Sequence, residues 1–325
     1  MDWFPLANKV YTINDVHQVY NKIKSNDLVN IDNRQENNEI KHYNSNKYND
    51  KFYDKNVTLV INISYNDYKH KYLWITDFFQ EVPRLKCKRK GSNFEINKLR
   101  GFANNIKNRT MEEQRHLLID KISSWCGTYP INVAYIIYQT FKPKRILDMS
   151  AGWGDRLLAA TMYGPELYVG VDPNSSLFDG YKKIVQTFVE PEKQQNYKLL
   201  ESPFENVDLG NQNFDLMFSS PPYFVGEEYS KDKGQTYLNY SEIDAWLDNF
   251  LFVSIDKIWM HLTDGGIFAL DLNNLKIEGN VVYFMDKVND HLNKLYNSEY
   301  IGVIRHKFLS HSHTTPIWIW RKLPY

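Results

Sequence analysis

The sequence has no excess of charge, no long apolar segment and little cysteine. Its 325 residues hold 39 Lys and Arg against 39 Asp and Glu, so the formal net charge is zero. No global field then draws the chain onto a polyanion, and any affinity for nucleic acid has to come from local patches. No apolar run approaches the roughly 20 residues that a membrane span needs, so we expect no membrane partner.

Cysteine and targeting signals are equally sparse. The only two cysteines, Cys87 and Cys126, lie far apart in the sequence. No basic segment followed by an apolar one marks a secretory signal. These features predict two free thiols in a reducing compartment, and hence an intracellular protein of the cytoplasm, of a host cell or of the nucleoid rather than a secreted one.

Composition and length allow a well-packed core. Apolar residues make up 42% and charged residues 24% of the chain, as in an ordinary folded protein. The length suffices for one large α/β domain with a smaller module. The pattern changes near residue 116, which divides the chain into an N-terminal α+β region (1–115), which could bind substrate, and a second domain (116–325).

The N-terminal region contains several local signals. Apolar, β-rich runs at residues 57–63 and 72–79 predict strands, and the polar stretch 33–56 predicts a long loop. A basic stretch from Arg84 to Arg100 could bind phosphates or form a solvated surface. Thr110-Met-Glu-Glu has a capping-box pattern and predicts the start of a helix.

From residue 116, short apolar runs alternate with helical segments. The expected strands lie at residues 145–148, 167–172, 197–200, 214–218 and 266–270. Apolar strands separated by helices indicate a doubly wound, mostly parallel sheet of an α/β protein. Two further runs, at 300–304 and 316–320, would complete seven strands as an antiparallel pair.

A glycine-containing turn follows the first of these strands. The strand ends at Asp148, and Gly152 and Gly154 follow before an apolar helix. Glycines at such a turn let the backbone approach a ligand closely, although a plain tight turn is an equally good reading of the motif alone. The next strand ends at Asp172, whose carboxylate could accept hydrogen bonds from both hydroxyls of a ribose. A dinucleotide site would need a third glycine where Leu157 stands.

The fourth strand runs directly into Ser219-Ser220-Pro221-Pro222-Tyr223. Two prolines fix φ and remove two backbone donors, so this turn can present the Ser220 hydroxyl and the Pro221 carbonyl to an amino group. Tyr223 offers a face on which a base can stack. Two acceptors would orient the lone pair of an exocyclic amino nitrogen toward a sulfonium methyl, and most of the catalysis would be positioning.

A lone Pro-Pro-Tyr is more often a structural turn, but its place after the glycine turn and the acidic strand end favours a catalytic site. Together these motifs resemble the class I S-adenosylmethionine-dependent amino-methyltransferases of DNA, the N6-adenine and N4-cytosine families, over about residues 125–325. The resemblance implies a Rossmann-like sheet, S-adenosyl-L-methionine as cofactor and an exocyclic amino group of DNA as methyl acceptor. Serine before the prolines is the form associated with N4-cytosine enzymes. A target base in a duplex would have to be flipped out.

The resemblance also implies residue roles. Ser220, Pro221, Pro222 and Tyr223 would form the catalytic turn. Asp148 and Gly152 would contact the methionine moiety and Asp172 the ribose, and residues 127–130 resemble the segment that caps the methionine tail. Glu201, Ser202 and Phe204 would border the adenine. The other implied cofactor residues are Tyr129, Ser150, Trp153, Gly154, Pro173 and Ser219.

Several alternatives remain open. The same chemistry could act on RNA, at adenosine N6 or guanosine N2. Protein-glutamine methyltransferases use Asn where this chain has Ser220, and intact motifs disfavour a non-catalytic binding subunit. Neither cysteine follows a proline in a catalytic-looking loop, which disfavours transfer to C5 of cytosine.

Two polar connections could contact the nucleic acid. The loop at residues 230–237 could close over the base, contact phosphate or be a solvated connection. His306, His311 and His313 lie between the last two strands and could line the nucleic-acid channel together with Arg305 and Lys307. As a zinc site, this cluster lacks further ligands, so we expect no metal.

Overall fold

The structure is a computed structural model. It describes residues 12–25, 29–32, 59–65, 74–87, 96–123, 126–222, 224, 234–272, 274–277, 280–295, 297–308 and 315–324. Several predicted features lie outside these residues: the loop at 33–56, residues 88–95 of the basic stretch, Tyr223, the first half of the loop at 230–237, and the pair His311 and His313.

Within the described residues, nine strands form one sheet in the order β1-β2-β10-β11-β7-β6-β3-β4-β5. One end of the sheet, up to the edge strand β5, consists of mutually parallel strands. They are β3 (Arg145–Asp148), β4 (Leu167–Asp172), β5 (Tyr197–Glu201), β6 (Phe214–Ser219) and β7 (Leu262–Leu270). β11 (Thr315–Lys322) runs antiparallel to both β7 and β10 (Ser298–Phe308). All seven strands expected after residue 116 are therefore confirmed, and the fold is the predicted doubly wound, mostly parallel, Rossmann-like α/β sheet.

Two N-terminal strands extend this sheet beyond the expected seven. β2 (Leu59–Tyr65) pairs parallel to β10, and β1 (Val29–Asp32) pairs antiparallel to β2. The strand predicted at 57–63 is thus confirmed from Leu59 onward. Since the edge of β10 is open to pairing, the N-terminal region shares the sheet, and the prediction of a seven-stranded sheet is corrected to nine.

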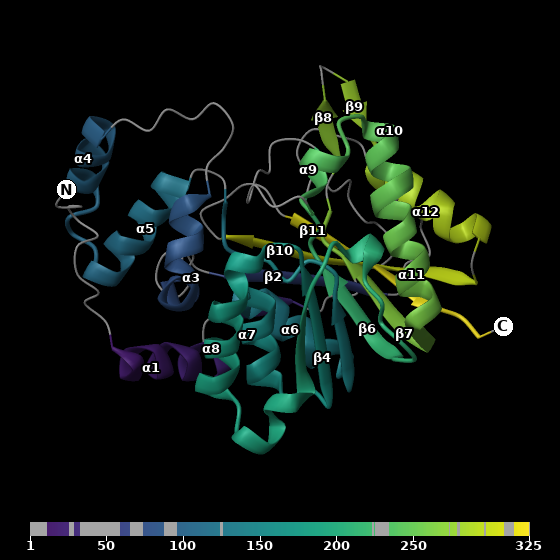
Figure 1. Cartoon of the computed structure of the whole chain (residues 1–325), viewed down its shortest axis with the longest axis horizontal. Coiled ribbons are helices and arrows are strands. Elements are labelled where there is room, and N and C mark those ends of the chain that lie inside the picture. The colour runs from purple at the N-terminus through teal and green to yellow at the C-terminus, as the bar shows by residue number, and fades with distance from the viewer. Residues whose placement is uncertain are drawn as a thin grey trace.

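Helices cover both faces of the sheet (Figure 1). On one side lie α6 (Ile131–Phe141), α7 (Asp155–Tyr163) and α8 (Phe178–Phe188), and on the other α10 (Ile243–Trp246), α11 (Val253–His261) and α12 (Phe284–Leu295). Neighbouring residues of one strand face opposite cores, as Ile146 and Leu147 do. The remaining elements are α9 (Thr236–Asn239), the hairpin β8 (Leu275–Ile277) and β9 (Asn280–Val282), the π-helix Leu247–Phe252 and the short 3-10 turns Ser175–Leu177, Pro191–Asn196 and Phe204–Asn206.

The predicted strand at 72–79 is wrong, because the helix α3 (Trp74–Lys86) begins at Trp74. Asp77, Gln80 and Arg84 are all buried on it, with the spacing of one helical face. These buried positions of the helix are polar, so its helical period does not appear in the pattern of apolar residues. The apolar residues between 72 and 79 instead have the pattern of a strand.

The other N-terminal helices flank α3. They are α1 (Ile13–Lys24), α4 (Ile96–Asn105) and α5 (Met111–Ser123), and α3 packs on α1, α5 and α8. The capping box at the start of α5 is confirmed: the Glu113 amide donates to Thr110 Oγ1 and the Thr110 amide to Glu113 Oε2, both over 3.3 Å. The predicted division after residue 115 falls inside α5.

The prediction of two free thiols is wrong as well. Cys87, just after α3, forms a disulfide with Cys126, with Cα atoms 6.4 Å apart. The pairing depends on how α3 docks, which sequence spacing does not reveal. None of the helices in the described ranges combines the length and apolar character needed to cross a membrane.

Candidate active site

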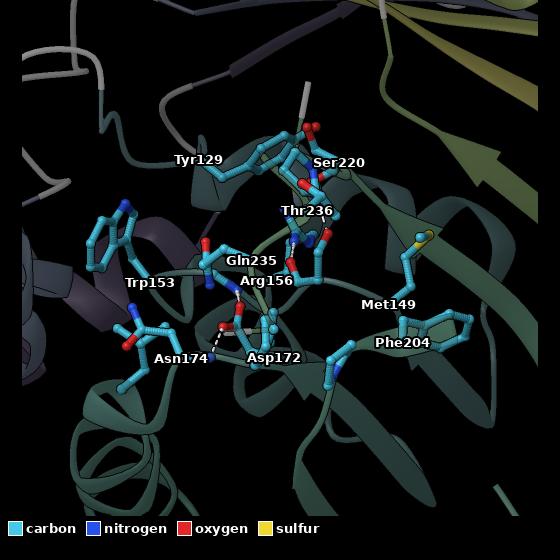
Figure 2. Close-up of a pocket in the computed structure, with 18 of the residues that line it drawn as sticks. Tyr129, Met149, Trp153, Arg156, Asp172, Asn174, Phe204, Ser220, Gln235 and Thr236 are labelled. Carbon is cyan, nitrogen blue, oxygen red and sulfur yellow. Dashed lines mark hydrogen bonds between the residues drawn. The ribbon is translucent and has the colours of Figure 1, made fainter. Parts of the chain in front are cut away.

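A cavity of about 270 Å³ lies at the carboxyl ends of the parallel strands (Figure 2). Its wall comes from the turns after β3, β4, β5 and β6, together with residues 127–129 and 234–236. In doubly wound sheets this edge is where ligands bind. The cavity therefore occupies the place expected for a cofactor site.

The structure brings most of the predicted site residues to this cavity. Those that line it are Tyr129, Ser150, Gly152, Trp153, Asp172, Pro173, Phe204, Ser220 and Pro222. Those that do not are Asp148, Gly154, Glu201, Ser202, Ser219 and Pro221. Residues of the glycine turn and of the proline turn thus share one cavity.

The glycine turn is shaped by backbone angles that other residues rarely adopt. Gly152 has φ of 56° and Gly154 of 91°, in the left-handed region that favours glycine. The Gly152 amide donates to Asp172 Oδ2 over 2.9 Å, and the Tyr181 hydroxyl donates to the Gly152 carbonyl. Gly154 does not face the cavity but forms the N-cap of α7.

Asp172 presents a buried carboxylate beside this turn. Its oxygens accept from the amides of Gly152 and Asn174, each over 2.9 Å, as the dashed lines in Figure 2 show. Burial raises the pKa of Asp172 to about 7. Each carboxylate oxygen has a second lone pair, so Asp172 can accept further hydrogen bonds from hydroxyls in the cavity.

Asp148 does not face the cavity, which corrects the expected contact with a methionine moiety. Its carboxylate is completely buried and accepts from Arg156 Nε over 2.8 Å, from the Tyr168 hydroxyl over 2.9 Å and from Ser219 Oγ over 2.9 Å. Asp148, at the end of β3, is therefore the centre of a polar network that lies behind the cavity wall. Ser219 is part of the same network and is completely buried too.

Arg156 is a cavity residue that the sequence analysis missed. Burial disfavours its charge, but the adjacent Asp148 carboxylate outweighs this and raises the pKa of Arg156. Its guanidinium lies 5.2 Å from the ring centre of Tyr129 and donates to the Ser150 carbonyl. The cavity wall thus holds a permanent positive charge.

Tyr129 is held at both ends. Its amide donates to Asp155 Oδ2 and its hydroxyl to Asp271 Oδ2, each over 2.8 Å. Figure 2 shows its ring beside Ser220 at one end of the cavity. His306, which the sequence suggested for a nucleic-acid channel, is buried with Nε2 3.6 Å from Asp271 Oδ2 and does not line the cavity.

The proline turn is tied to the glycine turn. Ser150 Oγ donates to the Ser220 carbonyl over 2.9 Å and lies 2.7 Å from Ser219 Oγ. The Asp271 amide donates to the Ser219 carbonyl over 3.0 Å. These bonds hold Ser220 and Pro222 at the cavity, while Pro221 is buried beneath them.

The expected adenine border is shifted along the chain. Glu201 is exposed, and Ser202 Oγ donates to the Pro203 carbonyl over 2.9 Å. Of the three predicted residues only Phe204 lines the cavity, together with Pro203 and Glu205. Lys257 Nζ holds this segment by donating to the carbonyls of Phe204, Glu205 and Val207 over 3.0, 2.8 and 2.7 Å. The strand continues one residue further than expected, which moves the turn.

The N-terminal helix α3 contacts the part of the cavity wall that Trp153 and Asp155 form. The Thr76 hydroxyl donates to Asp155, whose pKa burial raises to about 6. Arg84 pairs with Asp77, donates to the Cys126 carbonyl over 3.4 Å and lies 5.9 Å from the ring of Trp153. Because Arg84 is completely buried, it belongs neither to a phosphate-binding surface nor to a solvated one, the two roles that the sequence left open for the basic stretch.

Other cavity residues also escaped the sequence analysis, among them Met149, Asn174, Gln235 and Thr236. Asn174 could have been found, since it follows Asp172-Pro173 at a strand end. Gln235 and Thr236 belong to the loop at 230–237, for which the sequence left several roles open. In the described ranges, no group of three or more His, Cys, Asp or Glu side chains could hold a metal ion.

No family model and no curated protein matches the sequence. Among solved structures, TrmN from Thermus thermophilus is 13% identical with a TM-score of 0.41, over 61% of this chain and 50% of that one. An rRNA methylase from Streptococcus thermophilus is 15% identical with a TM-score of 0.37, over 61% of this chain and 98% of that one. The T. thermophilus 16S rRNA N2 G1207 methyltransferase (RsmC), solved with AdoMet and guanosine, is 15% identical with a TM-score of 0.40, over 62% and 45%.

The matched part spans half of the first of these chains and less than half of the third. At these identities and TM-scores, the similarities define neither the family nor the substrate of this chain.

Proposed function

We propose that the chain is an S-adenosylmethionine-dependent methyltransferase that methylates an exocyclic amino group of a base in DNA. One observation carries the proposal: Ser220 and Pro222 line the same cavity as Gly152 and Asp172. A cofactor held by the glycine turn would then lie next to the acceptors of the proline turn.

The cavity residues fit the parts of this cofactor. The Asp172 carboxylate would accept hydrogen bonds from the ribose, and Gly152 would allow close approach of the backbone. Phe204 and Met149, which Figure 2 shows together at one end of the cavity, would border the adenine ring. Arg156 would attract the methionine carboxylate.

When bound, the cofactor supplies an electrophilic methyl group on a sulfonium ion. The protein then has to orient the amino nitrogen that attacks it. The hydroxyl of Ser220, a residue of the cavity lining, would accept an amino hydrogen, which aims the nitrogen lone pair at the methyl group. After transfer the nitrogen carries positive charge and loses its proton readily, so no strong base is needed. Tyr223 would stack on the base.

A base that reaches this cavity has to leave its duplex or be unpaired beforehand. Serine before the prolines, as in enzymes of the N4-cytosine type, favours cytosine in DNA as the acceptor. Within this proposal, residues 116–325 carry the chemistry and residues 1–115 help to hold or select the substrate. The contacts of Thr76 and Arg84 with the cavity wall support a link between the two.

The proposal is tested by incubating the protein with radiolabelled cofactor and duplex DNA, single-stranded DNA or RNA, followed by mass spectrometry of the nucleosides. We expect N4-methylcytosine or N6-methyladenine from DNA. Label in RNA alone would replace DNA by RNA as the substrate. Label in neither nucleic acid would refute nucleobase methylation, and a protein that binds neither S-adenosylmethionine nor S-adenosylhomocysteine would refute the methyltransferase assignment.

A further inference from the structure

Residues 234–236 form a wall of the cavity that comes from far along the chain. They follow the proline turn and lead into α9, which begins at Thr236. The first turn of α9 fixes their backbone, since the Leu238 amide donates to the Gln235 carbonyl over 3.0 Å and the Tyr240 amide to the Thr236 carbonyl over 2.9 Å. Residues 234–236 therefore form an ordered part of the cavity wall.

Gly234 passes between the segments that follow β4 and β5. A Cβ atom on Gly234 would lie 2.7 Å from Pro173 Cβ and 2.9 Å from Pro203 Cγ, closer than side chains can approach. Pro173 follows Asp172, and Pro203 precedes Phe204. The chain at Gly234 thus crosses the part of the cavity between the proposed ribose and adenine positions.

Gln235 places a carboxamide in this wall. The residue is only 7% exposed, and Figure 2 shows it between Trp153 and Arg156 in the cavity. Although Gln235 is the N-cap of α9, its side chain makes no capping hydrogen bond. Among the described residues no group pairs with the carboxamide. The carboxamide is therefore available to donate and accept hydrogen bonds with a ligand in the cavity.

We propose that Gln235 binds the ribose of the cofactor, with its Nε2 donating to a hydroxyl oxygen whose hydrogen is accepted by Asp172. This inference rests on the proposed function. A carboxylate can only accept hydrogen bonds, whereas a ribose hydroxyl both donates and accepts. Asp172 therefore satisfies only the hydroxyl hydrogens, and an amide donor on the opposite wall satisfies the oxygens.

Calorimetric titration with S-adenosylhomocysteine tests this role in Gln235→Ala. We expect the Kd to rise about fivefold to tenfold, the effect of losing one hydrogen bond. Gln195→Ala is the matched control, because Gln195 is exposed on the turn Pro191–Asn196 and its amide donates only to the Glu192 carbonyl, over 3.3 Å. Its Kd should stay within about twofold of the wild type.

The same titrations with the 2′-deoxy and 3′-deoxy forms of the ligand identify the contacted group. Removal of the bonded hydroxyl should weaken binding to the wild type several-fold more than binding to Gln235→Ala, because the variant has already lost the contact. Equal losses in both proteins with both ligands would overturn the ribose assignment, as would an unchanged Kd in Gln235→Ala. A wild-type protein that binds no ligand at all would instead refute the proposed function.

Discussion

The Ser150 hydroxyl donates a hydrogen bond to the backbone carbonyl of Ser220 over 2.9 Å. The two residues belong to the turns after β3 and β6, which are neighbouring parallel strands. Ser150 Oγ also lies 2.7 Å from Ser219 Oγ, which donates to Asp148. The hydrogen bond from Ser150 therefore fixes the proposed catalytic turn relative to the glycine turn.

Ser150→Ala breaks this link without changing the backbone of either turn. We expect kcat for methyl transfer to fall about tenfold, since misplacement of reacting groups slows the chemical step, while the Kd of S-adenosylhomocysteine changes less than about threefold. Ser298→Ala, a substitution at the distant start of β10, serves as the control. A kcat equal to that of the wild type would show that the link does not position the catalytic turn.

Cofactor affinity should depend on pH through Asp172. Burial raises the pKa of this carboxyl to about 7, so the charged form, which is the stronger acceptor of ribose hydrogen bonds, is lost as the pH falls through neutrality. We expect the Kd of S-adenosylhomocysteine to decrease between about pH 6 and pH 8 and to level off above that range.

Asp172→Asn provides the control for this pH dependence. Asp155, with a pKa of about 6, also faces the cavity and titrates nearby, but it remains in the variant. Asp172→Asn should bind the ligand more weakly, with a higher Kd that no longer changes near pH 7. The same pH profile in both proteins would assign the dependence to Asp155 or another group.

Lys257 should stabilise the proposed adenine side of the cavity. Its ammonium group donates to three backbone carbonyls, including that of Phe204. In Lys257→Met these carbonyls lose a charged donor, and we expect the free energy of unfolding to fall by about 1–3 kcal/mol, with weaker ligand binding. Denaturant unfolding measures the first effect and calorimetry the second.

Lys144→Met is the matched control for this experiment. Its ion pair with Glu166 spans 3.3 Å between side chains that are 72% and 64% exposed, and such pairs contribute little. A loss of stability in Lys144→Met as large as that in Lys257→Met would contradict a specific role of Lys257.

The disulfide between Cys87 and Cys126 should stabilise the fold and the cavity together. Cys126 directly precedes Gly127, which lines the cavity. The double variant Cys87→Ser/Cys126→Ser should lose about 2–4 kcal/mol of unfolding free energy and bind S-adenosylhomocysteine more weakly. Thiol titration of the unreduced, denatured wild type should find no free thiol, and two free thiols would contradict the pairing.

The sequence predicted the strands after residue 116 because each is a short apolar run that ends at a distinctive turn. A run such as 167–172 is buried on both faces, so its pattern needs no knowledge of a partner. The capping box at Thr110 was an equally local signal. The meeting of Ser220 with Gly152 and Asp172 followed from the strand order, since the carboxyl ends of parallel strands share one edge.

The features that the sequence did not reveal depend on tertiary partners. Asp148 looked like a ligand residue, but Arg156 and Tyr168 surround its carboxylate. Arg84 looked like a surface cation, yet it is buried against Asp77. In each case a polar residue is paired with a group that lies elsewhere in the sequence or on an unrecognised helix face, and no local pattern carries that information.

Turnover and cofactor binding of the Ser220→Ala variant, measured in parallel, test whether the proline turn and the proposed cofactor site act as one centre. We expect kcat on DNA to fall at least about tenfold, while the Kd of S-adenosylhomocysteine stays within about twofold of the wild-type value. Tyr223→Ala should show the same separation of effects. Undiminished turnover in both variants would contradict the assignment of this turn to catalysis.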